Sequence, residues 1–147
     1  MSSDLFKQIE KSATDSIFAA EDVLSAIPWN TDGLIPAIAQ QYDSDEVLMM
    51  AWMNRLALEE TLNTGRVCYW SRSRSRFWRK GEQSGQIQLL KEAFLDCDGD
   101  TLLLKVDQTG PACHTGRKSC FYTALNASEA RVVNAPLIDA DELYGAH

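Results

Sequence analysis

The stretch DCDGD, residues 96–100, places three carboxylates around one thiol in five consecutive positions. In a regular strand Asp96, Asp98 and Asp100 would share one face, while Cys97 would point to the other. Carboxylates this close repel one another unless a cation lies between them, and oxygen ligands suit magnesium or calcium. The stretch therefore predicts either part of a metal site or a solvated acidic turn between two strands.

A second stretch, GPACHTGRKSC at residues 110–120, holds two thiols, Cys113 and Cys120, separated by six residues. A catalytic zinc takes three protein ligands and keeps a fourth position open, so these two thiols and one more would suffice. Cys97 is the natural third thiol, because it lies among carboxylates that could hold a second cation. Cys68, within VCYW, is expected to be a small buried side chain instead.

His114 stands directly beside the first of these thiols. It could be a zinc ligand, a general acid or base near neutral pH, or a structural residue that makes hydrogen bonds. Its position next to Cys113, between Gly110 and Gly116, favours acid or base chemistry.

The third stretch is YWSRSRSRFWRKGEQSG, residues 69–85. Arg72, Arg74 and Arg76 alternate with serines, and on a strand this spacing would direct three guanidinium groups to one face, an arrangement that suits phosphate. Charged side chains also protect the edges of sheets, so a solvated edge strand is the alternative. The nearby aromatic side chains, which could form a platform for a base, are Trp70, Phe77 and Trp78.

The segment KGEQSG at the end of this stretch is expected to be a loop beside the arginines. Gly81 and Gly85 would hinge it, and Lys80, Glu82 and Ser84 would line one wall of a substrate pocket.

Composition narrows the kind of protein that must position these groups. A length of 147 residues suits one domain. The net charge of −7 argues against general binding to nucleic acid or to anionic membranes. The longest apolar runs are far shorter than a membrane span, and the N-terminus does not read as a signal peptide. We therefore expect a cytoplasmic protein whose four cysteines are reduced.

The periodicity predicts a strand-rich α+β domain with a helix at each end. Residues 1–32 should form an amphipathic helix and a connector, residues 33–125 the catalytic domain, and residues 126–147 a tail or peripheral helix that packs on it. The expected elements are a helix over 3–27, strands over 34–42 and 46–53, a helix over 54–65 capped by Asn54 and ended by Gly65, a strand over 66–73, and a hairpin of strands 86–97 and 101–108.

Residues 33–122 resemble the phosphoribosyl-AMP cyclohydrolase family of histidine biosynthesis. The resemblance rests on LIPAIAQ, EVLMMAWMN, YWSRSRSRFWRKGEQSG and DCDGDTLLLKVDQTGPACHTGRKSCF, in this order. It implies a small, barrel-like homodimer that uses zinc and magnesium. The implied zinc ligands are Cys97 of one subunit with Cys113 and Cys120 of the other, and the implied magnesium ligands are Asp96, Asp98 and Asp100.

The reaction that the resemblance implies is hydrolysis of the N1–C6 bond of the adenine ring in 1-(5-phosphoribosyl)-AMP, which gives the formimino-AICAR ribonucleotide. Zinc would lower the pKa of a bound water towards about 7, and His114 is the candidate base that assists. Magnesium and the basic segment would hold the two phosphates. The candidate substrate-binding residues are Arg72, Arg74, Lys80, Glu82 and Ser84.

The sequence departs from the family pattern in two respects, and two other functions have to be weighed against ring hydrolysis. Gln86 stands where the family more often has Asn or His, and residues 123–147 are too few for the pyrophosphohydrolase domain that many relatives carry, so the chain is expected to be monofunctional. A zinc base deaminase is disfavoured because its H-x-E and P-C-x-x-C elements are absent. The remaining alternative is a non-catalytic, zinc-stapled interaction module, with His114 as a fourth ligand.

Overall fold

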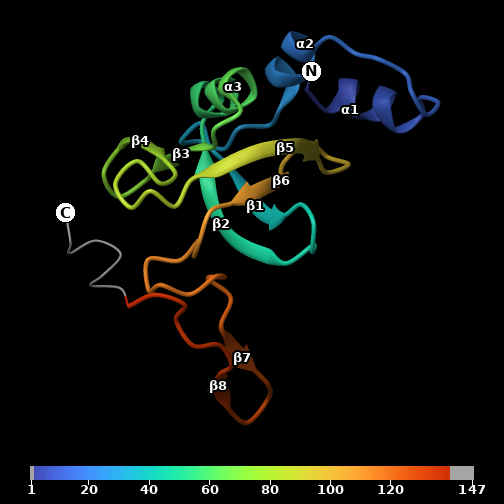
Figure 1. Ribbon diagram of the computed structural model, residues 1–147. Coiled ribbons are helices and arrows are strands. Elements are labelled where there is room, and N and C mark those ends of the chain that lie inside the picture. Colours follow the sequence, from blue (N-terminus) through green and yellow to red (C-terminus); the bar gives the residue numbers. More distant parts are fainter. Residues whose placement is uncertain (1, 140–147) are drawn as a thin grey trace.

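The computed structural model describes residues 2–139, in which a curled six-stranded sheet carries three helices and a separate two-stranded hairpin (Figure 1). The elements in chain order are α1 (Ser2–Glu10), α2 (Ala20–Ala26), β1 (Ile35–Gln41), β2 (Val47–Met53), α3 (Arg55–Thr64), β3 (Cys68–Ser71), β4 (Arg76–Arg79), β5 (Gln88–Leu95), β6 (Leu102–Gln108), β7 (Thr123–Leu125) and β8 (Ala130–Val132). The prediction of a strand-rich α+β domain is confirmed.

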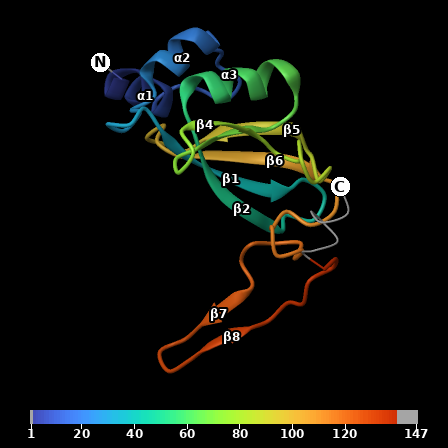
Figure 2. The ribbon, with the colours of Figure 1, turned by 90° about the vertical axis from the view of Figure 1, so that its left-hand side faces the viewer.

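The large sheet has the strand order β4-β3-β2-β1-β6-β5 and curls into half of a barrel. Neighbouring strands are antiparallel except β1 and β6, which run parallel. All three helices lie over one face of the sheet, and the β7–β8 hairpin projects away from the opposite side (Figure 2). Within residues 2–139, none of the helices combines the length and the apolar character needed to cross a membrane.

The core lies between the sheet and the helices. Along β1 the side chains alternate strictly between buried and partly exposed, as expected for a strand with one covered face. Ile35, Ala37 and Ala39 point into the core, where Leu104 of β6 and Leu58 of α3 are also buried. The central position of β1 therefore comes from its small and branched side chains, which pack closely under the helices.

The single N-terminal helix predicted over residues 3–27 is wrong, because the structure has two short helices, α1 and α2, with residues 11–19 between them. This segment contains serine, threonine and aspartate, which hydrogen-bond to nearby backbone and compete with helix formation. Ser12 Oγ donates to the carbonyl of Gln8 at 2.8 Å, and Asp15 adopts a left-handed backbone conformation with φ of 72°. The chain thus turns back, and α1 packs beside α2.

Helix α3 begins and ends where the sequence predicts. Asn54 Oδ1 accepts a hydrogen bond from the backbone N–H of Ala57 at 2.8 Å, which caps the N-terminus. Gly65, with φ of 76°, ends the helix by donating its N–H to the carbonyl of Thr61. The predicted strands over 34–42, 46–53, 86–97 and 101–108 are confirmed as β1, β2, β5 and β6, with small differences at their ends.

The structure describes only part of residues 126–147, for which the sequence predicts a tail or a peripheral helix. Residues 126–139 form no helix and contain the short strand β8, and residues 140–147 lie outside the described part of the chain.

The loop that follows β6, residues 109–122, carries Cys113 and Cys120 and is docked on the sheet; we call it the cysteine loop. Cys120 donates its backbone N–H to the carbonyl of Leu48 at 2.7 Å, and Ser119 Oγ donates to the carbonyl of Val47 at 2.7 Å. The N–H of Cys113 donates to the carbonyl of Arg117, which closes the loop on itself. These bonds hold both cysteines beside the first residues of β2.

The chain then returns to this loop after the β7–β8 hairpin. Leu137 donates its N–H to the carbonyl of Gly116 at 2.8 Å, and Arg117 Nε donates to the carbonyl of Asn134 at 2.7 Å. A Cβ atom on Gly116 would overlap the carbonyl oxygen of Ile138. Glycine is therefore required here for a close approach as well as for its φ of 85°.

Replacing the cap of α3, Asn54→Ala, should lower the free energy of unfolding by about 1 kcal/mol, because the N–H of Ala57 loses its partner. Urea denaturation measures this loss. Asn63→Ala makes the same chemical change at an exposed position inside α3 and should leave the stability equal or slightly higher. Equal stabilities for the two variants would contradict the capping role.

Gly116→Ala should destabilise more than Gly33→Ala. Both glycines have positive φ, so each alanine costs roughly 1–2 kcal/mol, but no atom lies within 4 Å of a Cβ on Gly33. Hydrogen exchange provides the local readout: the amide of Leu137 should exchange faster in Gly116→Ala only. If the Leu137 amide keeps its protection in Gly116→Ala, the contact between residues 134–138 and the cysteine loop does not depend on the glycine.

Candidate active site

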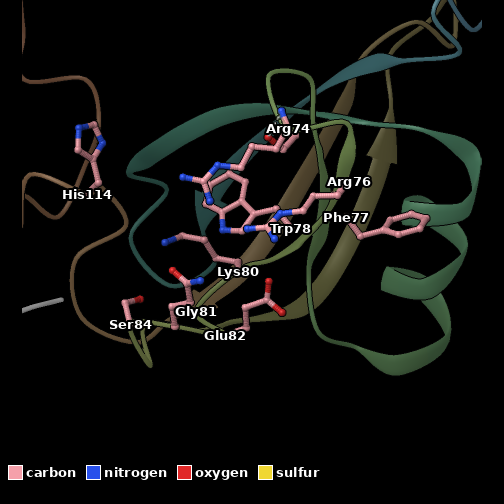
Figure 3. A pocket seen from close by; sticks show the side chains of 11 residues that line it. Arg74, Arg76, Phe77, Trp78, Lys80, Gly81, Glu82, Ser84 and His114 are labelled. Carbon is pink, nitrogen blue, oxygen red and sulfur yellow. Dashed lines mark hydrogen bonds between the residues drawn. The ribbon is translucent and has the colours of Figure 1, made fainter. Parts of the chain in front are cut away.

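A pocket of about 450 Å³ opens between the β3–β4 hairpin, the loop after β4 and the cysteine loop (Figure 3). Five of the six candidate catalytic and substrate-binding residues line it: Arg74, Lys80, Glu82, Ser84 and His114. Four of them belong to the stretch 69–85 and His114 belongs to the stretch 110–120, so the fold brings these two stretches together. The other lining residues are Ser71, Arg76, Phe77, Trp78, Gly81 and Gln83.

The expectation that Arg72, Arg74 and Arg76 lie on one face of a strand is wrong. Strand β3 ends at Ser71, residues 72–75 form a turn, and only Arg76 belongs to β4. The turn is needed to reverse the chain between two antiparallel strands, and Ser71 Oγ supports it by accepting the N–H of Arg74 at 3.3 Å. The three guanidinium groups consequently do not share one face of a strand.

Arg74 and Arg76 line the pocket, but Arg72 does not. The Arg72 guanidinium lies 4.6 Å from the ring centroid of Trp52, in a cation–π contact on the neighbouring part of the sheet. Its predicted role in substrate binding therefore has no support from the pocket geometry and stays a prediction.

Lys80 is the most deeply placed cation of the pocket, with only 4% of its surface exposed. Its backbone N–H donates to the carbonyl of Val67 at 3.0 Å, and its ammonium lies 5.8 Å from the ring centroid of Trp78. Burial lowers the pKa of Lys80, against a smaller opposing effect of the Cys120 and Cys113 thiols. A buried ammonium attracts an anion more strongly than a solvated one, because less water screens it.

The side chains of Lys80 and Arg74 extend towards the side of the pocket where His114 stands (Figure 3). Below them the loop 81–85 turns tightly: Gly85 donates its N–H to the carbonyl of Gly81 at 2.8 Å, and Gly81 has φ of 85°. A Cβ atom on Gly81 would meet the backbone of Ile87. The predicted glycine-bounded loop is confirmed, and it forms one wall of the pocket.

Cys113 and Cys120 lie together behind this pocket, and their thiols interact. Burial acts to raise the pKa of Cys113, but hydrogen bonds, foremost those of Thr115, outweigh it and lower the pKa overall. Thr115 Oγ1 donates to Cys113 Sγ at 3.1 Å. Burial, helped by the neighbouring Cys113 thiol, raises the pKa of Cys120 to about 12. Of the two thiols, Cys113 therefore loses its proton more easily than Cys120.

The DCDGD segment forms a turn beyond the end of β5, so the predicted alternation of Asp96, Asp98 and Asp100 against Cys97 does not apply. The backbone N–H of Asp100 donates to Asp96 Oδ1 at 2.9 Å. A hydrogen bond with Asp96 raises the pKa of Asp100. Burial acts to raise the pKa of Asp96, but the hydrogen bonds that it makes with Asp100 and with the backbone of residues 99–101 together outweigh burial and lower the pKa. The thiol and all three carboxylates are exposed.

This turn and the cysteine loop lie at opposite ends of β6. The strand has seven residues and rises about 3.3 Å per residue, so the two ends are roughly 20 Å apart. Cys97 therefore cannot share one ion with Cys113 and Cys120 of its own chain. Consistently, within residues 2–139 no three side chains of the histidine, cysteine, aspartate and glutamate types form a group that could hold a metal ion.

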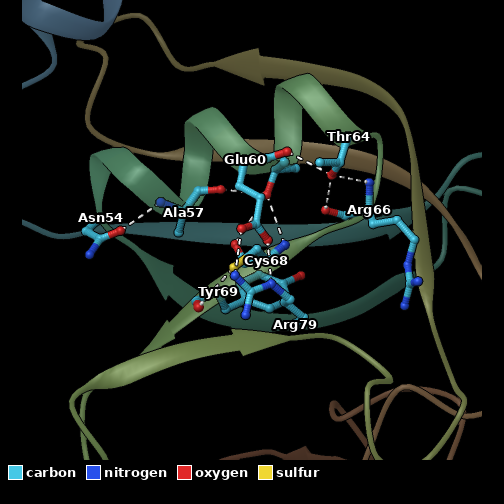
Figure 4. A network of polar contacts seen from close by, with 9 residues as sticks. Asn54, Ala57, Glu60, Thr64, Arg66, Cys68, Tyr69 and Arg79 are labelled. Carbon is cyan, nitrogen blue, oxygen red and sulfur yellow. Dashed lines mark hydrogen bonds and ion pairs between the residues drawn. The ribbon is translucent and has the colours of Figure 1, made fainter.

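Sequence reasoning missed the residues that support the pocket from behind. Arg79 makes an ion pair with Glu60 of α3 (Figure 4). Tyr69 is fully buried and donates its hydroxyl to Gln88 Oε1 at 2.7 Å, and burial raises the pKa of this tyrosine. Neither pair has a sequence signal, because their members are 19 residues apart and meet only in the folded chain.

Comparison with known proteins agrees with this geometry. The family model described as phosphoribosyl-AMP cyclohydrolase matches residues 49–122, which include the pocket, both cysteine-containing segments and the aspartate turn. A protein named phosphoribosyl-AMP cyclohydrolase from Chromohalobacter salexigens is 70% identical over 140 residues, which cover 95% of this chain and 96% of that protein.

Further relatives with the same name are equally well covered. The protein from Alkalilimnicola ehrlichii is 65% identical over 95% of this chain and 99% of its own length. The protein from Hydrogenovibrio crunogenus is 64% identical, with 95% of each chain covered. The chain belongs to the phosphoribosyl-AMP cyclohydrolase family, whose members are hydrolases.

Proposed function

We propose that this chain hydrolyses the N1–C6 bond of the adenine ring in 1-(5-phosphoribosyl)-AMP and so acts in histidine biosynthesis. The observation that carries the proposal is the pocket in which Arg74, Lys80 and His114 meet beside the Cys113 and Cys120 thiols. It combines groups that attract phosphate, a group that can move a proton, and thiols that can hold a Lewis acid. A family member would need each of these for this reaction.

The basic side chains bind and orient the substrate. The Lys80 ammonium and the Arg74 guanidinium would each hold phosphate oxygens, because charge-assisted hydrogen bonds are strongest where little water competes. Two phosphates on the substrate give two fixed points, which orient the purine between them. Trp78, which also lines the pocket, offers an aromatic surface to the ring.

His114 would move the proton. It is the histidine that lines the pocket, and it stands beside Cys113, so it is close both to the bound ring and to the thiols. As a general base it would take a proton from the attacking water. As the ring opens, it would return a proton to the departing N1 nitrogen.

The zinc ligands that we propose are Cys113 and Cys120 from one chain and Cys97 from a second copy. The two thiols that interact beside the pocket fit half of such a site, and the length of β6 excludes Cys97 of the same chain. When bound, zinc would supply a Lewis acid that lowers the pKa of a water towards about 7. Binding would release the proton that Cys120 retains.

Magnesium is the proposed partner of the aspartate turn. Oxygen ligands suit this ion, and the raised pKa of Asp100, caused first by its hydrogen bond with Asp96, is what crowded carboxyl groups without a cation would have. Asp98, which also raises the pKa of Asp100 by its charge, would be the third ligand. In a second copy this turn would accompany Cys97 towards the pocket.

A homodimer would also cover apolar surface that the chain leaves open. On the face of the sheet away from the helices, Met50, Ile38, Leu103 and Phe94 lie side by side across four strands, and Met50 and Phe94 are each 45% exposed. Leu125 on the projecting β7–β8 hairpin is 80% exposed. Contiguous exposed apolar groups mark association surfaces. The second copy would also supply the third thiol, Cys97, and we expect the two copies to meet in the cytoplasm.

The test is ultraviolet absorbance of phosphoribosyl-AMP mixed with the purified protein, with and without a zinc chelator. We expect ring opening that the chelator stops. Cys113→Ala should lose zinc and ring opening together, whereas Cys68→Ala, which removes a buried thiol that does not line the pocket, should keep its zinc. Full turnover by zinc-free protein would refute zinc chemistry, and no turnover by zinc-loaded protein would favour a structural zinc module.

His114→Ala should keep its zinc and slow ring opening roughly 100-fold or more, because a positioned acid or base contributes about this much. Zinc content by atomic absorption and kcat by absorbance separate the two effects. A wild-type rate would remove His114 from the reaction, and simultaneous loss of zinc would make it a metal ligand instead.

A further inference from the structure

Behind the pocket, an ion pair ties helix α3 to the edge of the sheet (Figure 4). Arg79 Nε donates to Glu60 Oε2 at 2.8 Å, and Arg79 Nη2 donates to Glu60 Oε1 at 2.8 Å. Two parallel hydrogen bonds of this kind fix the orientation of both side chains as well as their distance. The hydrogen bond with Arg79 outweighs burial and lowers the pKa of Glu60, so the pair is charged at neutral pH.

The strand that carries Arg79 is held to β3 by its ladder and by the ring contacts of Phe77 with Trp70 and of Trp78 with Tyr69. Strand β4 has four residues, lies at the edge of the sheet and pairs only with β3. Short edge strands with a single neighbour open easily. The ion pair adds an attachment of β4 to α3, a helix whose own ends are capped.

Because side chains alternate along a strand, the position of Arg79 also affects the direction of the Lys80 side chain. Arg79 lies on the same face of β4 as Phe77, 5.8 Å from its ring centroid, and Lys80 lies with Trp78 on the other face. Holding Arg79 against α3 therefore turns the Lys80 ammonium into the pocket.

The loop after β4 depends on the same residue. The backbone N–H of Glu82 donates to the carbonyl of Arg79 at 3.0 Å, which starts the turn that leads to Gly85. Displacing Arg79 would shift both Lys80 and the loop wall.

We propose that Glu60 and Arg79 are a positioning pair, which touches no substrate but keeps Lys80 and the loop 81–85 in place to bind a phosphate group. The inference rests on the proposed function for the identity of the substrate. It does not rest on it for the phosphate chemistry, since inorganic phosphate can be measured alone.

The Arg79 side chain is 49% exposed and the Glu60 side chain 30% exposed. Ion pairs at this exposure contribute little to global stability. A merely structural pair would therefore change nothing measurable at the pocket. A positioning pair would weaken phosphate binding while the protein remains equally folded, and this difference makes the two roles separable.

The test compares Glu60→Gln with Glu21→Gln. Glu21 of α2 pairs with Arg55 of α3 at 2.7 Å, away from the pocket, so the control removes the same charge from another ion pair that ties α3 to its surroundings. We expect Glu60→Gln to raise the KM for phosphoribosyl-AMP, and the Kd for inorganic phosphate, about fivefold. The kcat and the melting temperature should stay equal to those of Glu21→Gln.

Two further variants complete the design. The exchange of Glu60→Arg with Arg79→Glu should recover part of the phosphate affinity that either single reversal loses. If Glu60→Gln does not fold, Arg79→Lys takes its place, because lysine keeps the charge but cannot make two parallel bonds.

Equal phosphate Kd values for Glu60→Gln and Glu21→Gln would overturn the positioning role. Because phosphate binding needs no turnover, this result is distinct from a failure of the wild-type protein to open the adenine ring.

Discussion

The length of strand β6 is the constraint on which the site depends. Its seven residues carry the chain straight from the aspartate turn to the cysteine loop, and its parallel pairing with the buried strand β1 keeps it rigid. A strand roughly 20 Å long cannot bring its two ends together, so Cys97 lies far from Cys113 and Cys120 of the same chain. The pocket lies beside the thiol pair at one of these ends. The zinc site that we propose would therefore need two chains, which links the proposed chemistry to the proposed dimer.

The pocket itself is built from small devices rather than from one large element. A turn directs Arg74 inward and Arg72 onto Trp52, a pair of glycines closes the loop beside Lys80, and a docked loop presents His114. The turn and the two loops are each attached to the sheet or to α3, so these irregular segments are anchored at several points. Cations gathered this way are held close to one another in a chain of net charge −7, and that arrangement favours an anionic ligand.

Much of the fold was open to prediction from the sequence because its signals are local. The cap at Asn54, the glycine at position 65 and the strand patterns of β1, β2, β5 and β6 all act within a few residues. The errors arose where a local pattern had two solutions. Alternating serine and arginine fits a strand, but the reversal between β3 and β4 needs a turn there, and the apolar spacing of residues 3–27 fits one helix as well as two.

The sequence by itself determined the chemical parts: two thiols six residues apart, a third among aspartates, a histidine beside the first, and a basic segment rich in glycine and aromatics. These depend on residue type and spacing, which need no fold to be read. Only the tertiary structure decided which parts meet. It joined Arg74, Lys80 and His114 in one pocket, separated Cys97 from the other two thiols, and paired Glu60 with Arg79. The physical reason is that long-range proximity comes from strand order and strand length, which no short stretch of sequence contains.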